Sequence, residues 1–292
     1  MKAQRGKVDK GQTFVIYATQ VQPMALQKEV SGMGRLEGKV AIITGAGQGV
    51  GRGIALAFAK EGARVIIAEI NPETAKAVVG EIKQLGAEAL TVVCDVGDEK
   101  QVKKMVARAA KKFGPIDILV NNAQRWTGGS AYHLSSPIES LPEEWWDMAF
   151  QSGIKGTWYC CKAVFPYMKE RGGKIINFAS YMGVVGLEGS ADYNSNKEAI
   201  RGFSRTAARE WGKYKINVNV ICPSALTPAM IAYGMAFPDK IEEMTKEMEK
   251  IPLKRVGDPE KDIGPVAVFL ACSDSDFVTG QTLMVDGGLH MF

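Results

Sequence analysis

Histidine is nearly absent from this chain of 292 residues, and cysteine is scarce. The two histidines, His133 and His290, have no partner at metal-ligand spacing, so we expect no metal centre. The five cysteines show no C-x-x-C pairing and each lies in an apolar run, as expected of reduced core residues in a cytoplasmic protein. No apolar run reaches the roughly 18–20 residues of a membrane span, so we expect no membrane partner.

Residues 36–292 carry no net charge, so the net positive charge belongs to the first residues of the chain. Residues 1–35 hold six lysines and arginines against two acidic residues, which accounts for the whole formal charge of +4. A basic arm could contact nucleic acid, but this one is sparse and has no arginine cluster, so we expect no nucleic-acid partner. The apolar stretch 13–21 is too short and too polar for a signal peptide. We expect 1–34 to be a flexible N-terminal extension and 35–292 to be the folded domain.

From Lys39 onward, short β-branched runs alternate with longer amphipathic stretches. This alternation is typical of βαβ units on a parallel sheet, whose strands are apolar on both faces. The predicted strands are 40–43, 64–68, 90–94, 116–120, 174–178, 216–221 and 282–285. The predicted helices lie near 50–61, 73–85, 98–113, 142–170, 192–213 and 260–272. The pattern predicts an α/β protein, a single doubly wound Rossmann domain with a seven-stranded parallel sheet. Segment 224–257 is too apolar for a simple connector, so we expect a substrate-binding insertion there.

A glycine-rich loop joins the first predicted strand to the first predicted helix. Its sequence, T-G-A-G-Q-G-V-G, runs from Thr44 to Gly51. Glycines at this position allow a tight turn and close approach of the backbone to a pyrophosphate, which the helix N-terminus then faces. Because a strand precedes the loop and a helix follows it, we expect a dinucleotide site.

An acidic residue, Glu69, ends the second predicted strand about 20 residues beyond the loop, where a carboxylate accepts hydrogen bonds from the adenosine ribose. The same carboxylate would repel a 2′-phosphate. No basic residue follows Glu69 closely, and Gln48 rather than a cation occupies the loop. The sequence therefore favours NAD over NADP.

A tyrosine and a lysine lie four positions apart in Tyr193-Asn194-Ser195-Asn196-Lys197, within a predicted helix. At that spacing Tyr193 and Lys197 share one helix face. A positive charge near a phenol favours the phenolate, so the pair is a candidate for proton transfer. The same spacing also occurs on solvated helices, where a tyrosine packs along a lysine stem.

Taken together, these motifs resemble those of the short-chain dehydrogenase/reductase family over residues 35–292. The resemblance also rests on Asn121-Asn122-Ala123, on Ser180, which precedes Tyr193 by the family's 13 positions, and on Val285-Asp286-Gly287-Gly288. It implies that Ser180, Tyr193 and Lys197 are catalytic, that Asn121 fixes neighbouring strand ends, and that the protein forms a dimer or tetramer, with the homotetramer as our expectation.

The resemblance also implies a set of residues that bind the cofactor. They are Gly45, Gln48, Gly49, Val50, Gly51, Glu69, Asp95, Val96, Asn122, Ala123, Tyr193, Lys197, Pro223 and Leu226.

Three positions depart from the family pattern. Gly153 stands where a helix asparagine commonly organises the proton relay. Gln124 replaces the glycine of N-N-A-G and could reach the nicotinamide or the substrate. The segment after the sixth strand is one residue short before Thr227, which makes Thr227 doubtful as a contact to the carboxamide.

Two apolar segments, 124–141 and 224–257, flank the expected position of the nicotinamide. Ligand pockets are mostly apolar, and methionine suits irregular shapes. We therefore expect a hydrophobic secondary alcohol or ketone as the small-molecule substrate, with cyclic, steroid-like or terpenoid compounds as options. The insertion's methionines would equally fit plain packing of a helix on the domain. The candidate substrate-binding residues are Gln124, Trp126, Ser180, Met182, Leu187 and Tyr193.

Two other functions remain open on the sequence alone. A 3-oxoacyl thioester reductase is the first, although such reductases usually favour NADP. A catalytically weak NAD-binding scaffold is the second, and only Gly153 and Gln124 speak for it. The sequence does not identify the substrate or the physiological direction of the reaction.

Overall fold

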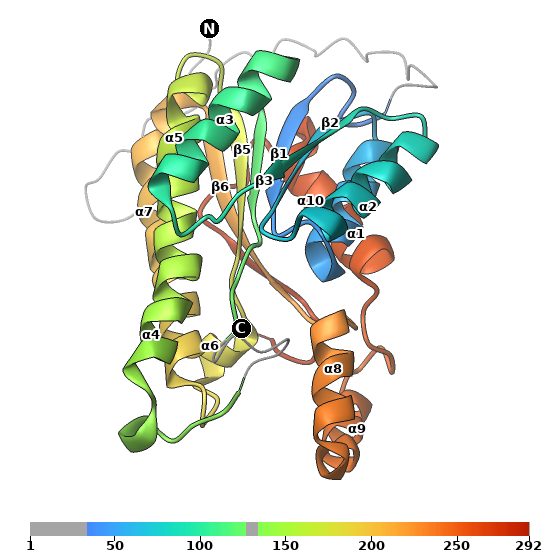
Figure 1. Ribbon diagram of the computed structural model, residues 1–292, viewed down its shortest axis with the longest axis vertical. Helices are drawn as coiled ribbons and strands as arrows, with labels where there is room; N and C mark the ends of the chain where they lie inside the picture. The colour runs from blue at the N-terminus through green and yellow to red at the C-terminus, as the bar shows by residue number, and fades with distance from the viewer. Residues whose placement is uncertain (1–33, 127–133, 292) are drawn as a thin grey trace, which may run out of the picture. The chain divides into compact units, whose positions relative to one another are not determined.

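The computed structural model describes residues 34–126 and 134–291, apart from the side chains of Glu243 and Met244. These residues contain a seven-stranded parallel sheet in the order β3-β2-β1-β4-β5-β6-β7 (Figure 1). The strands are β1 (Val40–Thr44), β2 (Arg64–Glu69), β3 (Ala89–Val93), β4 (Ile118–Asn121), β5 (Gly173–Phe178), β6 (Ile216–Pro223) and β7 (Thr282–Val285). The predicted fold class is confirmed. Except for Gly34, the predicted extension 1–34 lies outside the described residues.

Helices cover both faces of the sheet. One face packs against α1 (Gly49–Lys60), α2 (Pro72–Gln84) and α10 (Gly264–Ala271) (Figure 1). The other face packs against α3 (Glu99–Phe113), α5 (Gly156–Met168) and α7 (Ala191–Trp211). The remaining α-helices are α4 (Glu143–Phe150), α6 (Tyr181–Val185), α8 (Pro228–Ala236) and α9 (Ile241–Glu249). The buried residues of α3, which are Val102, Met105, Val106 and Ala109, follow helical spacing and give that helix one apolar face.

The strand order reverses between β1 and β4. Strands β1, β2 and β3 extend in one direction from this point, and β4 to β7 extend in the other. The loops that leave β1 and β4 therefore diverge at the carboxyl edge of the sheet and open a crevice there, which is where doubly wound proteins bind ligands.

The predicted helix over 142–170 is interrupted. A π-helical turn, Gln151–Lys155, separates α4 from α5. Such turns insert one residue into the helical repeat and are frequent at functional sites. Gly153, within this turn, lies with its backbone against the Asn196 side chain of α7. The last predicted helix begins in a similar way, because the π-helical turn Pro259–Ile263 precedes α10.

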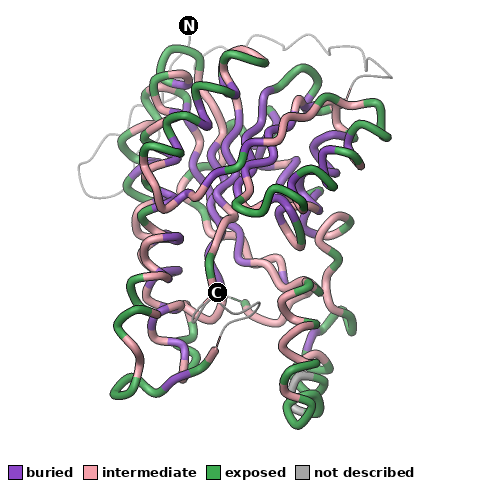
Figure 2. The backbone as a smooth tube through the Cα atoms, viewed as in Figure 1, coloured by how far each residue is buried: buried purple, intermediate pink, exposed green. Residues whose placement is uncertain are grey.

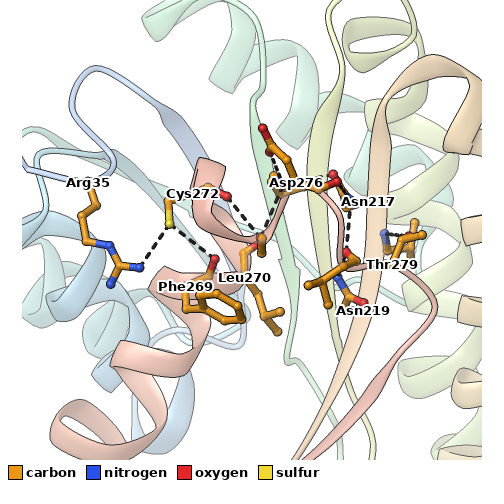
Figure 3. A network of polar contacts seen from close by, with 12 residues as sticks. Arg35, Asn217, Asn219, Phe269, Leu270, Cys272, Asp276 and Thr279 are labelled. Atoms are coloured by element: carbon orange, nitrogen blue, oxygen red, sulfur yellow. Dashed lines mark hydrogen bonds and ion pairs between the residues drawn. The ribbon is translucent and has the colours of Figure 1, made fainter. Parts of the chain in front are cut away.

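A polar network fixes the loop before β7 to the amino end of β6, far along the strand from the crevice (Figure 3). The Asn217 side chain donates hydrogen bonds to the carbonyl oxygens of Asp276 (2.9 Å) and Val278 (3.1 Å). Asn219 donates to the same Val278 carbonyl (2.8 Å) and accepts from the backbone of Gln281 (3.1 Å). These bonds satisfy two asparagines on a strand that is otherwise apolar.

The predicted insertion 224–257 contains α8 and α9. Helix α8 is apolar in sequence, yet none of its residues is buried (Figure 2). Thr227 caps it by accepting a hydrogen bond from the backbone N–H of Met230 (3.3 Å). An apolar helix that the domain does not cover is unusual, and it lies beside the carboxyl edge of the sheet.

None of the helices in the described part of the chain combines the length and apolar character that a membrane crossing demands.

Candidate active site

A cleft of about 300 Å³ lies at the carboxyl edge of the sheet. Nine of the predicted cofactor residues line it: Gly45, Gln48, Gly49, Val50, Glu69, Asp95, Val96, Asn122 and Ala123. Gln124 and Trp126, predicted to bind substrate, line it as well. The segment 127–133, which belongs to the first apolar segment and includes His133, lies outside the described residues.

The glycines of the Thr44–Gly51 loop are enforced by close packing. Gly45 has a φ of +62°, and a Cβ on it would lie 2.8 Å from the Cα of Ala123. A Cβ on Gly51 would collide with the Gly45 carbonyl and lie 2.6 Å from Nδ2 of Asn122. The loop thus leaves a backbone-lined cradle at the start of α1, which fits the pyrophosphate of a dinucleotide.

Asn122 supports this loop from β4. Its Nδ2 donates to the carbonyl oxygens of Thr44 (3.1 Å) and Gly45 (3.0 Å). The buried Thr44 hydroxyl in turn accepts from the backbone N–H groups of Asn122 and Ala123, both at 3.1 Å. Beside it, Asn121 donates to Asn177 on β5 at 2.9 Å and so joins the neighbouring strand ends.

Glu69 faces the loop from the end of β2. One carboxylate oxygen accepts the backbone N–H of Gly47 (3.0 Å), and the other accepts those of Ile70 (2.8 Å) and Asn71 (3.2 Å). The nearby cation Arg52 is paired with Glu81 on α2. The Glu69 carboxylate is therefore fixed where it could accept a hydrogen bond from a ribose hydroxyl of the cofactor.

Asp95, which follows β3 and also lines the cleft, forms an ion pair with Arg125 (3.0 Å), a residue that the sequence reasoning missed. Its second oxygen accepts the backbone N–H of Gly97 (2.9 Å). Asp95, Arg125 and Ser152 also border a neighbouring cavity of about 440 Å³, which is lined by α4 and the π-helical turn.

Ser180, Tyr193 and Lys197 come together beside the cleft. Ser180 caps α6 by accepting the N–H of Met182 (3.2 Å), and its side chain hydrogen-bonds Tyr193. Lys197 is 4% exposed, lies 5.4 Å from the centroid of the Tyr193 ring and donates to the carbonyl of Phe178 on β5 (3.1 Å). The predicted sharing of one helix face is confirmed by this geometry.

Burial controls the acidity of this pair. It raises the pKa of Tyr193 to about 12, an effect that the hydrogen bond with Ser180 partly offsets. Burial also lowers the pKa of Lys197 to about 8. In the protein alone the phenol is therefore held neutral, whereas the sequence led us to expect Lys197 to favour the phenolate. Desolvation is the largest cause of both pKa shifts.

Trp126 stacks on the Tyr193 ring, with the centroids 5.6 Å apart and the planes inclined by 24°. Since Trp126 also lines the cleft, this stack joins the proton-transfer pair to the predicted cofactor cleft.

Four other predicted cofactor or substrate residues do not line the cleft: Pro223, Leu226, Met182 and Leu187. Pro223 is the last residue of β6 and Leu226 is 49% exposed, whereas Thr227 does line the cleft. Met182 is half-buried on α6, and Leu187 is exposed on the connection from α6 to α7. The structure thus brings Thr227, which the sequence spacing made doubtful, to the cleft in place of Leu226.

Gln124 and Gly153, the two other departures from the family pattern, both contact Asn196 of α7. Asn196 Nδ2 donates to Gln124 Oε1 at 2.9 Å. A Cβ on Gly153 would lie 2.5 Å from Asn196 Cγ. Sequence reasoning gave Asn196 no role, because an asparagine within a helix carries no signal of its own.

The described residues contain no group of three or more histidine, cysteine or acidic side chains placed to hold a metal ion.

Comparison with known proteins agrees with this geometry. The family model described as "Enoyl-(Acyl carrier protein) reductase" matches residues 45–290. A 12alpha-hydroxysteroid dehydrogenase of Clostridium sp. is 40% identical and aligns over 88% of this chain and 98% of its own length. The 3-oxoacyl-[acyl-carrier-protein] reductase FabG of Thermotoga maritima is 36% identical over 87% of this chain and 99% of its own length.

A solved structure is also similar. The 7 alpha-hydroxysteroid dehydrogenase, determined with NADH and 7-oxo glycochenodeoxycholic acid, is 35% identical, with a TM-score of 0.79. The alignment covers 87% of this chain and 95% of that one.

The chain belongs to the short-chain dehydrogenase/reductase family, as the motifs indicated. It is an oxidoreductase of alcohols and ketones that uses a nicotinamide cofactor.

Proposed function

We propose that this protein is an NAD-dependent dehydrogenase that interconverts a hydrophobic secondary alcohol and its ketone. The observation that carries the proposal is the arrangement of the cleft. Glu69 stands at the end that would receive the adenosine ribose, and Trp126 joins the cleft to Tyr193 at the other end.

In this proposal, Tyr193 exchanges a proton with the substrate oxygen, and Ser180 donates a hydrogen bond to that oxygen. When bound, the nicotinamide cofactor supplies the acceptor or donor of hydride. Because burial raises the pKa of Tyr193 to about 12, the phenol is protonated at neutral pH and suited to ketone reduction. Alcohol oxidation needs the phenolate, so its rate should rise as the pH becomes alkaline.

We propose that the cofactor is held by the glycine loop, Asp95, Val96, Asn122 and Thr227. The Glu69 carboxylate supports NAD over NADP, because a 2′-phosphate beside it would meet a like charge that Arg52, paired with Glu81, does not offset.

The substrate side is proposed to be formed by Gln124, Trp126, Met182 and the insertion with its unburied α8. A flat, cyclic, steroid-like alcohol would give the apolar α8 and the Trp126 ring a complementary surface. The similarity to two hydroxysteroid dehydrogenases supports this substrate class.

Reduction of a 3-oxoacyl thioester is the second candidate, and the similarity to FabG favours it. The alternative of a catalytically weak NAD-binding scaffold rests on Gly153 and Gln124. Both residues contact Asn196, which supports an organised site instead.

The test is turnover on a panel of substrates. Wild type, Tyr193→Phe and Tyr214→Phe would be assayed with NAD and NADP on hydroxysteroids and other cyclic secondary alcohols, and with NADPH on a 3-oxoacyl thioester. Tyr214 packs against Phe165 on another helix and serves as the matched control. We expect NAD-linked oxidation of a cyclic alcohol that Tyr193→Phe abolishes and Tyr214→Phe retains.

Other outcomes would decide against parts of the proposal. A clear preference for NADP would contradict the interpretation of Glu69, and activity that survives Tyr193→Phe would contradict the proton-transfer role. Cofactor binding without turnover of any compound would favour the scaffold.

We also propose a homotetramer and a cytoplasmic location. Trp146 and Trp158, on the α4–α5 side, are 38% and 45% exposed, which supports burial of these aromatic rings in a subunit contact. All five cysteines are buried and free, which fits a reducing compartment. Cell fractionation tests the location, and recovery of the native protein outside the cell would contradict it.

A further inference from the structure

Two departures from the family pattern that are 29 positions apart in sequence, Gln124 and Gly153, meet at one buried side chain. That side chain is Asn196, which is fully buried in α7 and directly precedes Lys197.

The Asn196 amide fills the space beside Gly153. A Cβ at position 153 would lie 2.5 Å from Asn196 Cγ and would collide with both terminal atoms of the amide. Any other residue at 153 would therefore have to displace the Asn196 side chain, and in this sense the glycine and the asparagine require each other.

Both polar atoms of the Asn196 side-chain amide form hydrogen bonds. Asn196 Oδ1 accepts the backbone N–H of Ile154 (2.8 Å), which lies within the π-helical turn. Its Nδ2 donates to Gln124 Oε1 (2.9 Å), and Gln124 Nε2 donates to the carbonyl of Arg125 (3.0 Å) and to Ser152 Oγ (3.3 Å). The network joins α7, the turn between α4 and α5, and the segment that leaves β4.

We propose that Asn196 is a positioning residue that supplies, from α7, the amide that the family places at the position of Gly153, and that Gln124 completes this network. The proposal rests on the proposed function.

The reason lies in how Lys197 is held. Its Nζ donates to the carbonyl of Phe178 on β5 (3.1 Å), while the preceding residue, Asn196, joins the helix to the segment after β4 and to the π-helical turn. Loss of the Asn196 amide would remove this connection and misplace Lys197 and Tyr193, and a shift of about 1 Å can lower a rate about 100-fold.

The experiment compares wild type, Asn196→Ala, Gly153→Asn and the double variant Gly153→Asn/Asn196→Ala, which moves the amide from one helix to the other. We expect Asn196→Ala to lower kcat about 10- to 100-fold and Gly153→Asn to lower it about 100-fold or more. The double variant should recover to within about 10-fold of wild type. Gly153→Asn combined with Ser195→Ala, a change on the same helix, is the matched control and should not recover.

The pH dependence separates positioning from general damage. In Asn196→Ala the apparent pKa of the pH profile of kcat/KM should shift, because Lys197 no longer lies where it favours the phenolate, and the double variant should restore it. If Gly153→Asn does not yield soluble protein, Asn196→Ala still decides, since it removes atoms without a clash.

A double variant no better than Gly153→Asn, or an Asn196→Ala enzyme with kcat within about 3-fold of wild type and an unchanged pH profile, would overturn the positioning role alone. A wild type that turns over none of the panel substrates would overturn the proposed function itself, so the two failures are distinguishable.

Discussion

Replacing Lys197 by methionine should make the protein more stable at neutral pH while it removes activity. Lys197 is 4% exposed, and its ammonium donates a hydrogen bond to the carbonyl of Phe178. Methionine keeps an unbranched side chain of comparable length and carries no charge to desolvate.

The magnitude follows from the lowered pKa. Burial takes the pKa of Lys197 from 10.5 to about 8. At about 1.4 kcal/mol per pKa unit, the buried charge destabilises the folded state by about 3 kcal/mol below pH 8. Loss of the bond to Phe178 costs about 1–2 kcal/mol, so the net gain in the free energy of unfolding is about 1–2 kcal/mol at pH 7.

The pH dependence has a definite sign. Between pH 8 and 10.5 the unfolded chain binds a proton on Lys197 that the folded chain has released, so the wild type gains stability as the pH rises through this window. The methionine variant lacks this gain, and its advantage should shrink and then reverse.

Urea denaturation at pH 7 and pH 10, at one fixed protein concentration, measures both effects. Lys104→Met, which replaces an exposed lysine on α3, is the matched control and should show no such pH dependence. A Lys197→Met protein that is less stable than wild type at pH 7, or a difference that does not change with pH, would refute the reasoning.

Two further predictions concern packing. Gly51→Ala should abolish cofactor binding and lower the melting temperature by several degrees, because the new methyl would collide with the Gly45 carbonyl. Gly80→Ala, with nothing within 4 Å of its Cβ position, should instead stabilise α2 by up to about 1 kcal/mol. Calorimetry and a cofactor titration measure both effects, and unimpaired cofactor binding by Gly51→Ala would contradict the proposed pyrophosphate cradle. Light scattering should give the mass of a tetramer that Trp158→Glu dissociates, and a monomeric wild type would contradict the proposed assembly.

The architecture was predictable because it rests on local patterns. Each parallel strand is an apolar run, and the described strands begin and end within two residues of the predicted positions. The error was the uninterrupted helix over 142–170. At the π-helical turn Gly153 lies against Asn196 of a helix distant in sequence, and no local pattern reports such a contact.

The site was predictable where the chemistry needs a fixed spacing. Ser180, Tyr193 and Lys197 were proposed in this way, and the structure brings them together, while their catalytic role stays a prediction. Arg125 and Asn196 were missed because their partners are distant in sequence: Arg125 pairs with Asp95, and Asn196 bonds Gln124. The pKa of Tyr193 in the protein alone was not predictable either, since it depends on burial, which the whole fold determines.

The unburied state of α8 has a consequence for how this enzyme can change. Substitutions at exposed positions away from caps usually alter stability by less than about 0.5 kcal/mol, so random libraries at Ile231, Met235 and Ala236, the exposed positions of α8 beyond its first residue, should yield folded proteins at high frequency. The glycine loop allows no such freedom, because the Cβ positions of Gly45, Gly47 and Gly51 are already filled. With α8 on the substrate side, as proposed, selection at its exposed positions would change substrate preference while the cofactor site stays fixed, which makes these positions targets for directed evolution.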